Sequence, residues 1–221
     1  MDIFIIILLF IAAYLLGSIP GGYLLTTFIK NDDIRKYGSN STGATNATRV
    51  LGIGYGILAG LIDVLKGMIV PSILMIFNLT NYSEVIISNN VINILPLYGI
   101  FAVIGHIFPL YLNFKGGKAV ATSFGLALLF SPYLALLGVV AFIIIFLITK
   151  YVSLGSIFGS TIILIGTFIF YLLEIPLLGR PIIEIEVLIT YFILVGIIWI
   201  RHIPNIKRLL KGEENRVKRI K

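Results

Sequence analysis

The 221-residue chain contains no cysteine, only two histidines and ten acidic residues, and 12% of its residues are charged. Without cysteine it has no disulfides, thiol nucleophiles or thiolate metal ligands. So few histidines and carboxylates also leave little for a metal cage. A soluble domain is about one quarter charged, so this chain has too few polar groups to cover a folded surface in water. An ordinary soluble enzyme is therefore excluded.

Long apolar runs are present instead: 58% of the residues are hydrophobic and the mean hydropathy is +1.05. A membrane-spanning helix needs about 20 apolar residues. The apolar stretches of sufficient length are 3–29, 51–79, 91–114, 119–149, 151–173 and 182–200. The sequence predicts a single integral membrane domain over residues 1–221, all-α in fold class.

The stretch 119–149 would form a helix about 46 Å long, whereas the hydrocarbon core is about 30 Å thick. Ser131-Pro132 interrupts it, and the residue before a proline disfavours helix. We expect a short arm (119–130) and a longer arm (133–149) that form a tilted or re-entrant hairpin. The prediction is then seven transmembrane helices, one of them short.

The basic residues orient these helices. With the N-terminus outside and the C-terminus cytoplasmic, all but Lys66 and Arg180 of the 17 lysines and arginines fall in or beside inner segments, as the positive-inside rule requires. Without the hairpin, the basic tail 207–221 would lie outside. The positive charge is therefore mainly an orientation signal, and we expect no nucleic-acid partner.

Three clusters on the inner face contain polar and glycine residues that orientation does not require. The first, 37–49, combines hydroxyls and glycines with Arg49 at a helix start. Amide N–H groups, a positive helix end and a guanidinium together suit an anion. A capped helix start with an orienting arginine is the alternative.

The second cluster is 114–118, in which two glycines permit close backbone approach and two lysines supply charge. It is not a Walker A loop, since Ala119 stands where Ser or Thr should follow the lysine. The alternative to an anion-binding loop, a simple glycine turn with lysines flanking the membrane, is equally consistent with the sequence.

The third cluster pairs 151–156 with 201–205. His202 and Asn205 are three residues apart, a spacing that lets both face one site. Ser153 and Ser156 share this spacing, although serines at a helix start are commonly caps.

Two further features lie within spans. Asp63 and Lys66 are three residues apart and can pair on one helix face; a structural ion pair and a functional role are both open. His106, close to Pro109, is either a buried hydrogen-bonded histidine or a site residue. From the residues alone, the three inner clusters predict an enzyme or a transporter that handles a phosphorylated compound.

These residues resemble the PlsY family of bacterial acyl-phosphate:glycerol-3-phosphate acyltransferases, and the resemblance covers nearly the whole chain. The motifs that carry it, in chain order, are Gly17-Ser18-Ile19-Pro20, Gly43-Ala44-Thr45-Asn46 with Arg49, Asp63-Val64-Leu65-Lys66-Gly67, Gly105-His106-x-Phe108-Pro109, Phe114-Lys115-Gly116-Gly117-Lys118, Tyr151-Val152-Ser153-Leu154-x-Ser156 and Arg201-His202-x-x-Asn205.

The resemblance implies a multi-pass enzyme of the bacterial cytoplasmic membrane with its active site on the cytoplasmic side. It would transfer a fatty acyl group from acyl phosphate to the 1-position of sn-glycerol 3-phosphate, forming lysophosphatidic acid. It implies no metal, no cofactor and no acyl-enzyme. Membrane lipid and a soluble acyltransferase that makes acyl phosphate are the further partners it suggests.

The resemblance also implies the site residues. Those in catalytic roles are Ser39, Arg49, Lys118, His202 and Asn205, and those that bind substrate are Gly43, Thr45, Asn46, Lys115, Gly116, Gly117, Ser153 and Ser156. The first motif departs from the family pattern, because Asn40 and Ser41 stand where a glycine and an asparagine are usual. A membrane transporter of a phosphorylated small molecule is the competing prediction, with a polar site reaching the midplane.

Overall fold

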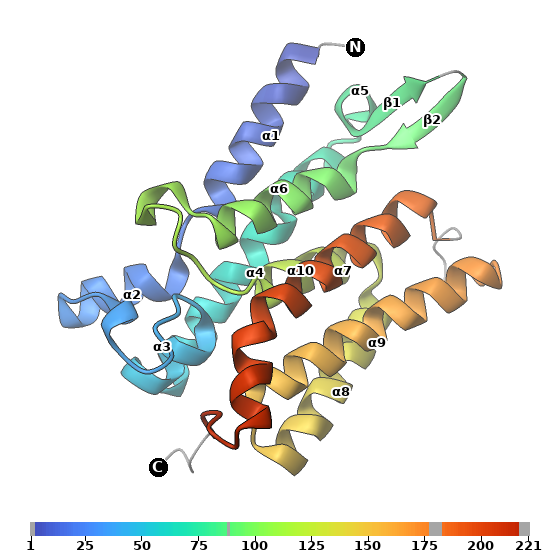
Figure 1. The fold of residues 1–221 in the computed structure, drawn as a ribbon. Coiled ribbons are helices and arrows are strands. Elements are labelled where there is room, and N and C mark those ends of the chain that lie inside the picture. Colours follow the sequence, from blue (N-terminus) through green and yellow to red (C-terminus); the bar gives the residue numbers. More distant parts are fainter. Residues whose placement is uncertain (1–2, 88, 177–182, 217–221) are drawn as a thin grey trace. The chain divides into compact units, whose positions relative to one another are not determined.

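The computed structural model describes residues 3–87, 89–176 and 183–216 and is built mainly from helices (Figure 1). The α-helices are α1 (Ile3–Gly17), α2 (Gly21–Lys30), α3 (Ala44–Leu51), α4 (Ile53–Ile76), α5 (Thr80–Ser83), α6 (Leu95–Ile107), α7 (Val120–Phe130), α8 (Pro132–Thr149), α9 (Val152–Leu172) and α10 (Ile185–Leu210). Two 3-10 turns, η1 (Ile34–Lys36) and η2 (Leu110–Leu112), and two strands, β1 (Glu84–Ile87) and β2 (Asn90–Asn93), complete the described elements.

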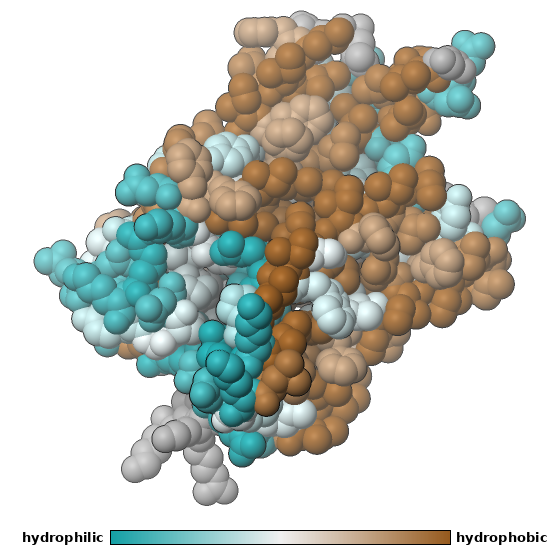
Figure 2. Space-filling model, in the orientation of Figure 1, coloured by the Kyte–Doolittle hydropathy of each residue, from teal (hydrophilic) through white to brown (hydrophobic). Residues whose placement is uncertain are grey.

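Several helices have the length and composition of membrane spans. Among the described residues, five helices meet this test: α4, α6 with the turn that follows it, α8, α9 and α10. The bent pair α1–α2 would make a sixth span, and α7 is a shorter apolar helix. Much of the surface is apolar, as Figure 2 shows, because side chains that face lipid need no polar covering. The protein is an integral membrane protein, while the count of seven helices and the orientation stay predictions.

The first apolar stretch is not one continuous helix. Helix α1 ends at Gly17, and α2 begins at Gly21 at an angle of 43° to it. Pro20 occupies the N-cap of α2, where its missing N–H cannot continue the hydrogen bonding of α1. The break at Ser18–Pro20 therefore divides 3–29 into two helices.

The predicted span 91–114 begins later than expected, and the otherwise helical fold includes one short hairpin. Residues 90–93 form β2, which pairs antiparallel with β1, with Val85 opposite Ile92. Valine and isoleucine favour strands, and Asn89 has the left-handed conformation (φ 68°) suited to a hairpin turn. The hairpin therefore occupies the start of the predicted span, and the following helix begins only at Leu95.

The break at Ser131-Pro132 is confirmed, because α7 ends at Phe130 and α8 begins at Pro132. Helix α10, in contrast, runs on past the expected end near Ile200 and continues through Pro204 to Leu210. Residues 205–210 are thus the last part of a long helix. The predicted start of this span at Ile182, and Arg180, lie outside the described residues.

The chain divides into two packed units, Met1–Leu129 and Phe130–Lys221. In the first, α4 packs against α2, α3 and α6, and α7 approaches α4 at backbone distance. A Cβ added at Gly67 would lie 2.1 Å from the Thr122 carbonyl oxygen, and one added at Gly125 would lie 2.1 Å from that of Val64. In the second unit, α9 packs against α8 and α10. The prediction of a single domain over 1–221 stays a prediction.

Candidate functional site

The first inner cluster is a loop folded around the side chain of Asn46. Its Oδ1 accepts a hydrogen bond from the Ser39 amide (2.9 Å), and its Nδ2 lies 2.9–3.2 Å from the carbonyl oxygens of Ile34, Tyr37 and Ser41. Asn46 is 1% exposed. In this structure its amide therefore shapes the loop that presents Ser39, and its contact with a substrate stays a prediction.

The two departures from the family motif fit this loop. Asn40 has a left-handed backbone (φ 56°), a conformation that asparagine tolerates better than most residues other than glycine. The Ser41 hydroxyl lies 3.5 Å from the Gly43 amide, from which it accepts a weak hydrogen bond. Asn40 can thus replace a glycine without a change of backbone.

Helix α3 begins directly after this loop, as the sequence predicts. Gly43 is its N-cap and provides no side-chain cap, so the positive helix end is left to backbone amides. Thr45 and Arg49 are four residues apart on this helix and share one face. The described geometry therefore places Ser39, Thr45 and Arg49 around one loop and the helix that follows it.

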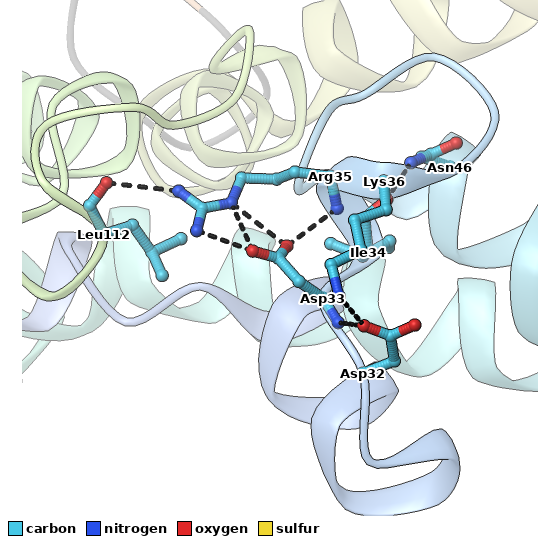
Figure 3. Close-up of polar contacts among 7 residues, drawn as sticks. All are labelled: Asp32, Asp33, Ile34, Arg35, Lys36, Asn46 and Leu112. Carbon is cyan, nitrogen blue, oxygen red and sulfur yellow. Dashed lines mark hydrogen bonds and ion pairs between the residues drawn. The ribbon is translucent and has the colours of Figure 1, made fainter.

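The first and second clusters are linked by Arg35, which the sequence prediction did not include (Figure 3). Its guanidinium binds both carboxylate oxygens of Asp33 (2.7 and 3.0 Å) and donates to the carbonyl oxygen of Leu112 (3.3 Å). It also lies 5.6 Å from the centre of the Tyr23 ring. The hydrogen bonds from Arg35 hold the pKa of Asp33 below its ordinary value, so the pair stays charged.

The second cluster follows η2 in a loop over residues 113–119. The Gly116 and Gly117 amides donate to the carbonyl oxygens of Ile107 and His106, both at 3.1 Å. Gly117 is buried, Lys118 is half-buried and Lys115 is exposed. The glycines thus pack against the end of α6, and a role of either in binding substrate stays a prediction.

The third cluster lies in the second unit, where α9 and α10 bring Ser153 and Asn205 to the same carboxylate oxygen. Glu214 Oε1 accepts from Ser153 Oγ (3.0 Å) and Asn205 Nδ2 (2.7 Å), and its Oε2 accepts from Arg208 Nε (2.8 Å). The Glu214 side chain is 5% exposed. Burial acts to raise the pKa of Glu214, but the hydrogen bonds from Asn205, Arg208 and Ser153 outweigh it and hold the pKa below its ordinary value.

Glu214 was missed by the sequence prediction. It lies nine residues after Asn205 and 61 residues after Ser153. An acidic residue in a basic tail was the only signal of it, and a solvated side chain explains that signal equally well.

His202 and Asn205 lie on one buried face of α10, with exposures of 2% and 4%, as their spacing predicts. His202 Nδ1 is 2.8 Å from the Ile198 carbonyl oxygen. A carbonyl can only accept, so Nδ1 carries a hydrogen and the ring orientation is fixed by its own helix. Ser156 Oγ donates to the Val152 carbonyl within α9 (3.0 Å). Among the described residues no group of three or more His, Asp or Glu could hold a metal ion.

Comparisons with known proteins identify the family. The family model described as "Glycerol-3-phosphate acyltransferase" matches residues 7–212. The chain belongs to the glycerol-3-phosphate acyltransferase family. It is 38% identical over 213 residues to two Staphylococcus aureus proteins named "Glycerol-3-phosphate acyltransferase", from strains bovine RF122 / ET3-1 and JH9, and covers 96% of its own length and 98% of each relative.

Two solved structures are also similar. Both are crystal structures of PlsY, an integral membrane glycerol 3-phosphate acyltransferase. Its glycerol 3-phosphate form has a TM-score of 0.80 at 36% identity and covers 96% of each chain. Its lysophosphatidic acid form has a TM-score of 0.77 at 34% identity and covers 96% of this chain and 95% of that one. The present protein is accordingly a membrane acyltransferase.

Proposed function

We propose that this protein transfers a fatty acyl group from acyl phosphate to the 1-hydroxyl of sn-glycerol 3-phosphate and forms lysophosphatidic acid. The observation that carries the proposal is the match to the glycerol-3-phosphate acyltransferase family over residues 7–212. The uncapped N-terminus of α3, which offers backbone amides to an anion, supports it. The related PlsY structures are of a glycerol 3-phosphate form and a lysophosphatidic acid form, which correspond to the acceptor and the product of this reaction.

The chemistry requires one bond to form and one to break. The 1-hydroxyl oxygen bonds to the acyl carbonyl carbon, and the bond from that carbon to the phosphate oxygen breaks. The released phosphate takes the hydroxyl proton. Acyl phosphate is an activated anhydride, so holding donor and acceptor in the reacting geometry supplies much of the acceleration. No covalent enzyme intermediate is needed.

In this proposal the residues of the first unit hold phosphate groups. Arg49 and Lys118 neutralise the charge, while Ser39 and Thr45 donate from the loop and the start of α3. Two observations support this assignment: the N-terminus of α3 has no side-chain cap, and Arg35 joins the loop that precedes α3 to the Leu112 backbone just before the lysine loop.

The residues of the second unit act on the acyl phosphate. His202 and Asn205 orient the donor and stabilise the charge that develops on the carbonyl oxygen. Their support is the shared buried face on α10 and the fixed ring of His202. Ser153 is held at the same carboxylate as Asn205 and adds a hydroxyl. The enzyme would act at the cytoplasmic face of a bacterial inner membrane, where both phosphorylated substrates are soluble or interfacial.

The test uses purified protein in lipid with labelled glycerol 3-phosphate and either palmitoyl phosphate or palmitoyl-CoA. We expect labelled 1-acyl lysophosphatidic acid from palmitoyl phosphate alone. Product from palmitoyl-CoA alone would overturn the donor, and a 2-acyl product would overturn the position. No product from either donor, with label entering sealed vesicles, would instead identify a transporter.

Variants test the residue roles. Arg49→Ala and Lys118→Ala should abolish transfer and leave the protein folded, because each removes a charged contact with phosphate. Lys36→Ala is the control in the same loop, since its ammonium is exposed and turned to Asp32. Full activity of the Arg49 or Lys118 variant would refute that residue's assignment.

A further inference from the structure

A buried group of ionisable residues in the first unit lies outside the residues assigned to substrate. Asp63, Lys66 and His106 are 1%, 6% and 6% exposed. Lys66 Nζ lies 2.7 Å from Asp63 Oδ1 and donates to the Ile19 carbonyl oxygen (2.8 Å), and His106 Nδ1 lies 3.5 Å from the same Asp63 oxygen. Asp63 and Lys66 belong to α4, and His106 lies near the end of α6.

This arrangement is costly for a membrane protein. Ionisable side chains within a span lose their hydration and are rare without a function. A buried ion pair adds little stability compared with apolar residues of similar size. Lys66 and His106 both face the same Asp63 oxygen. The Asp63 carboxylate of α4 thus lies against the His106 ring of α6.

The other edge of that ring touches the lysine loop. A Cβ added at Gly117 would lie 2.1 Å from His106 Nε2, and one added at Gly116 would lie 2.1 Å from the His106 carbonyl oxygen. The Gly117 amide donates to this carbonyl oxygen at 3.1 Å. His106 thus has Asp63 on its Nδ1 side and the backbone of the loop on its Nε2 side.

The loop itself is held in an unfavourable backbone conformation. Asn113, Phe114 and Ala119 have positive φ angles of 53°, 61° and 65°. Left-handed conformations are uncommon for phenylalanine and alanine, and such strain persists only where the surroundings impose it. Lys118 lies between two of these residues, so its position depends on whatever holds the loop.

The same part of α4 also fixes the far end of the loop. One residue beyond Asp63, the Val64 carbonyl oxygen meets Gly125 of α7, and Gly67 meets the backbone of Thr122. Helix α7 follows the loop directly. Residues 63–67 therefore contact both α6 and α7, the helices that lie before and after the loop.

We propose that Asp63 and His106 are positioning residues of this enzyme: the buried carboxylate orients the His106 ring, and the ring sets the backbone of 113–119 so that Lys118 reaches its phosphate. This inference rests on the proposed function for the role of Lys118. The order of the loop, however, is a property that can be measured without any reaction.

The experiment compares Asp63→Asn and His106→Asn with the parent protein in detergent. Asparagine at 63 removes the charge without changing size. Asparagine at 106 keeps a polar atom near the Nδ1 position but withdraws the atoms that touch Gly117, and it leaves the Asp63–Lys66 pair intact. The readouts are amide hydrogen exchange of the peptide 113–119, and KM for glycerol 3-phosphate with kcat measured beside it.

We expect both variants to fold and to exchange the 113–119 amides about tenfold faster or more. KM for glycerol 3-phosphate should rise about tenfold, as for the loss of one charge-assisted contact, with a smaller fall in kcat. Tyr98→Phe is the control on α6, because it removes a buried hydrogen bond to the Tyr82 carbonyl (2.7 Å) that is remote from the loop. It should change neither exchange of the loop nor KM.

Parent-like exchange and KM in folded variants would overturn the inference. So would misfolding of both variants and of the charge-neutral double variant Asp63→Asn/Lys66→Met, since that would make the group purely structural. If the parent protein makes no lysophosphatidic acid, the proposed function fails while hydrogen exchange still decides whether the buried group orders the loop.

Discussion

Removing the Glu214 carboxylate should separate the start of α9 from the end of α10. Glu214→Ala takes away the acceptor shared by Ser153 and Asn205, which are 5% and 4% exposed. Leaving two buried donors unsatisfied costs about 1–2 kcal/mol each. The bond to Arg208 adds little, because that side chain is 37% exposed and its charge is screened. The expected total is about 3 kcal/mol.

The single tryptophan of the chain suits the assay. Trp199 lies on α10, and its Nε1 donates to Thr161 Oγ1 of α9 (3.1 Å), so its fluorescence reports separation of the two helices. For a chain of this length about 3 kcal/mol corresponds to a fall in Tm of about 6–12 °C. Glu214→Gln retains one oxygen and should lose about half as much.

Glu213→Ala is the control, since this neighbouring glutamate is exposed. A Glu214→Ala protein that unfolds within about 2 °C of the parent would refute the reasoning. The activity should fall in parallel, because Asn205 would lose the bond that fixes its amide. An unchanged kcat in a destabilised protein would contradict that second part.

Three further predictions concern single changes. The pKa of Glu214 is depressed in the folded protein, so the stability that this residue contributes is present above about pH 4.5 and is lost as the pH falls through the lower folded-state pKa. The Tm followed by fluorescence should therefore drop on acidification. Glu214→Gln should remove this dependence. Gly38→Ala should lower both Tm and activity, because φ is +59° and the new Cβ would lie 2.2 Å from Asn46 Oδ1, whereas Gly54→Ala, with nothing within 4 Å, serves as the control. Arg35→Ala should raise KM for glycerol 3-phosphate by about tenfold at unchanged fold, because it removes the charge-assisted bond to the Leu112 carbonyl oxygen just before the lysine loop. An unchanged KM would show that the two loops are independent.

The sequence by itself determined the membrane character and much of the helix order. Apolar runs of bilayer length are a local property, so α4, α8 and α9 follow from composition alone. The break at Ser131 follows from the covalent geometry of the next proline. The spacing of His202 and Asn205 placed both on one helix face for the same reason.

Local patterns were less informative where two structures suit the same residues. The apolar residues Val91 and Ile92 fit a span or a strand, and pairing with Ile86 and Val85 decided for the strand. The stretch 3–29 is one uncharged run, and the structure divides it into two helices before Gly21. At Pro204 the opposite happened, because helix on both sides outweighed the one hydrogen bond that proline cannot make.

Only the tertiary structure decided which polar groups face one another. Asn46 turns its amide into the loop before α3, and His106 touches Gly117 on one side and Asp63 on the other. Glu214 binds Ser153, which lies 61 residues earlier in the chain, as well as Asn205. Such contacts join groups distant along the chain, and a buried polar atom takes whichever partner the packing supplies. No period or spacing in the sequence specifies that partner.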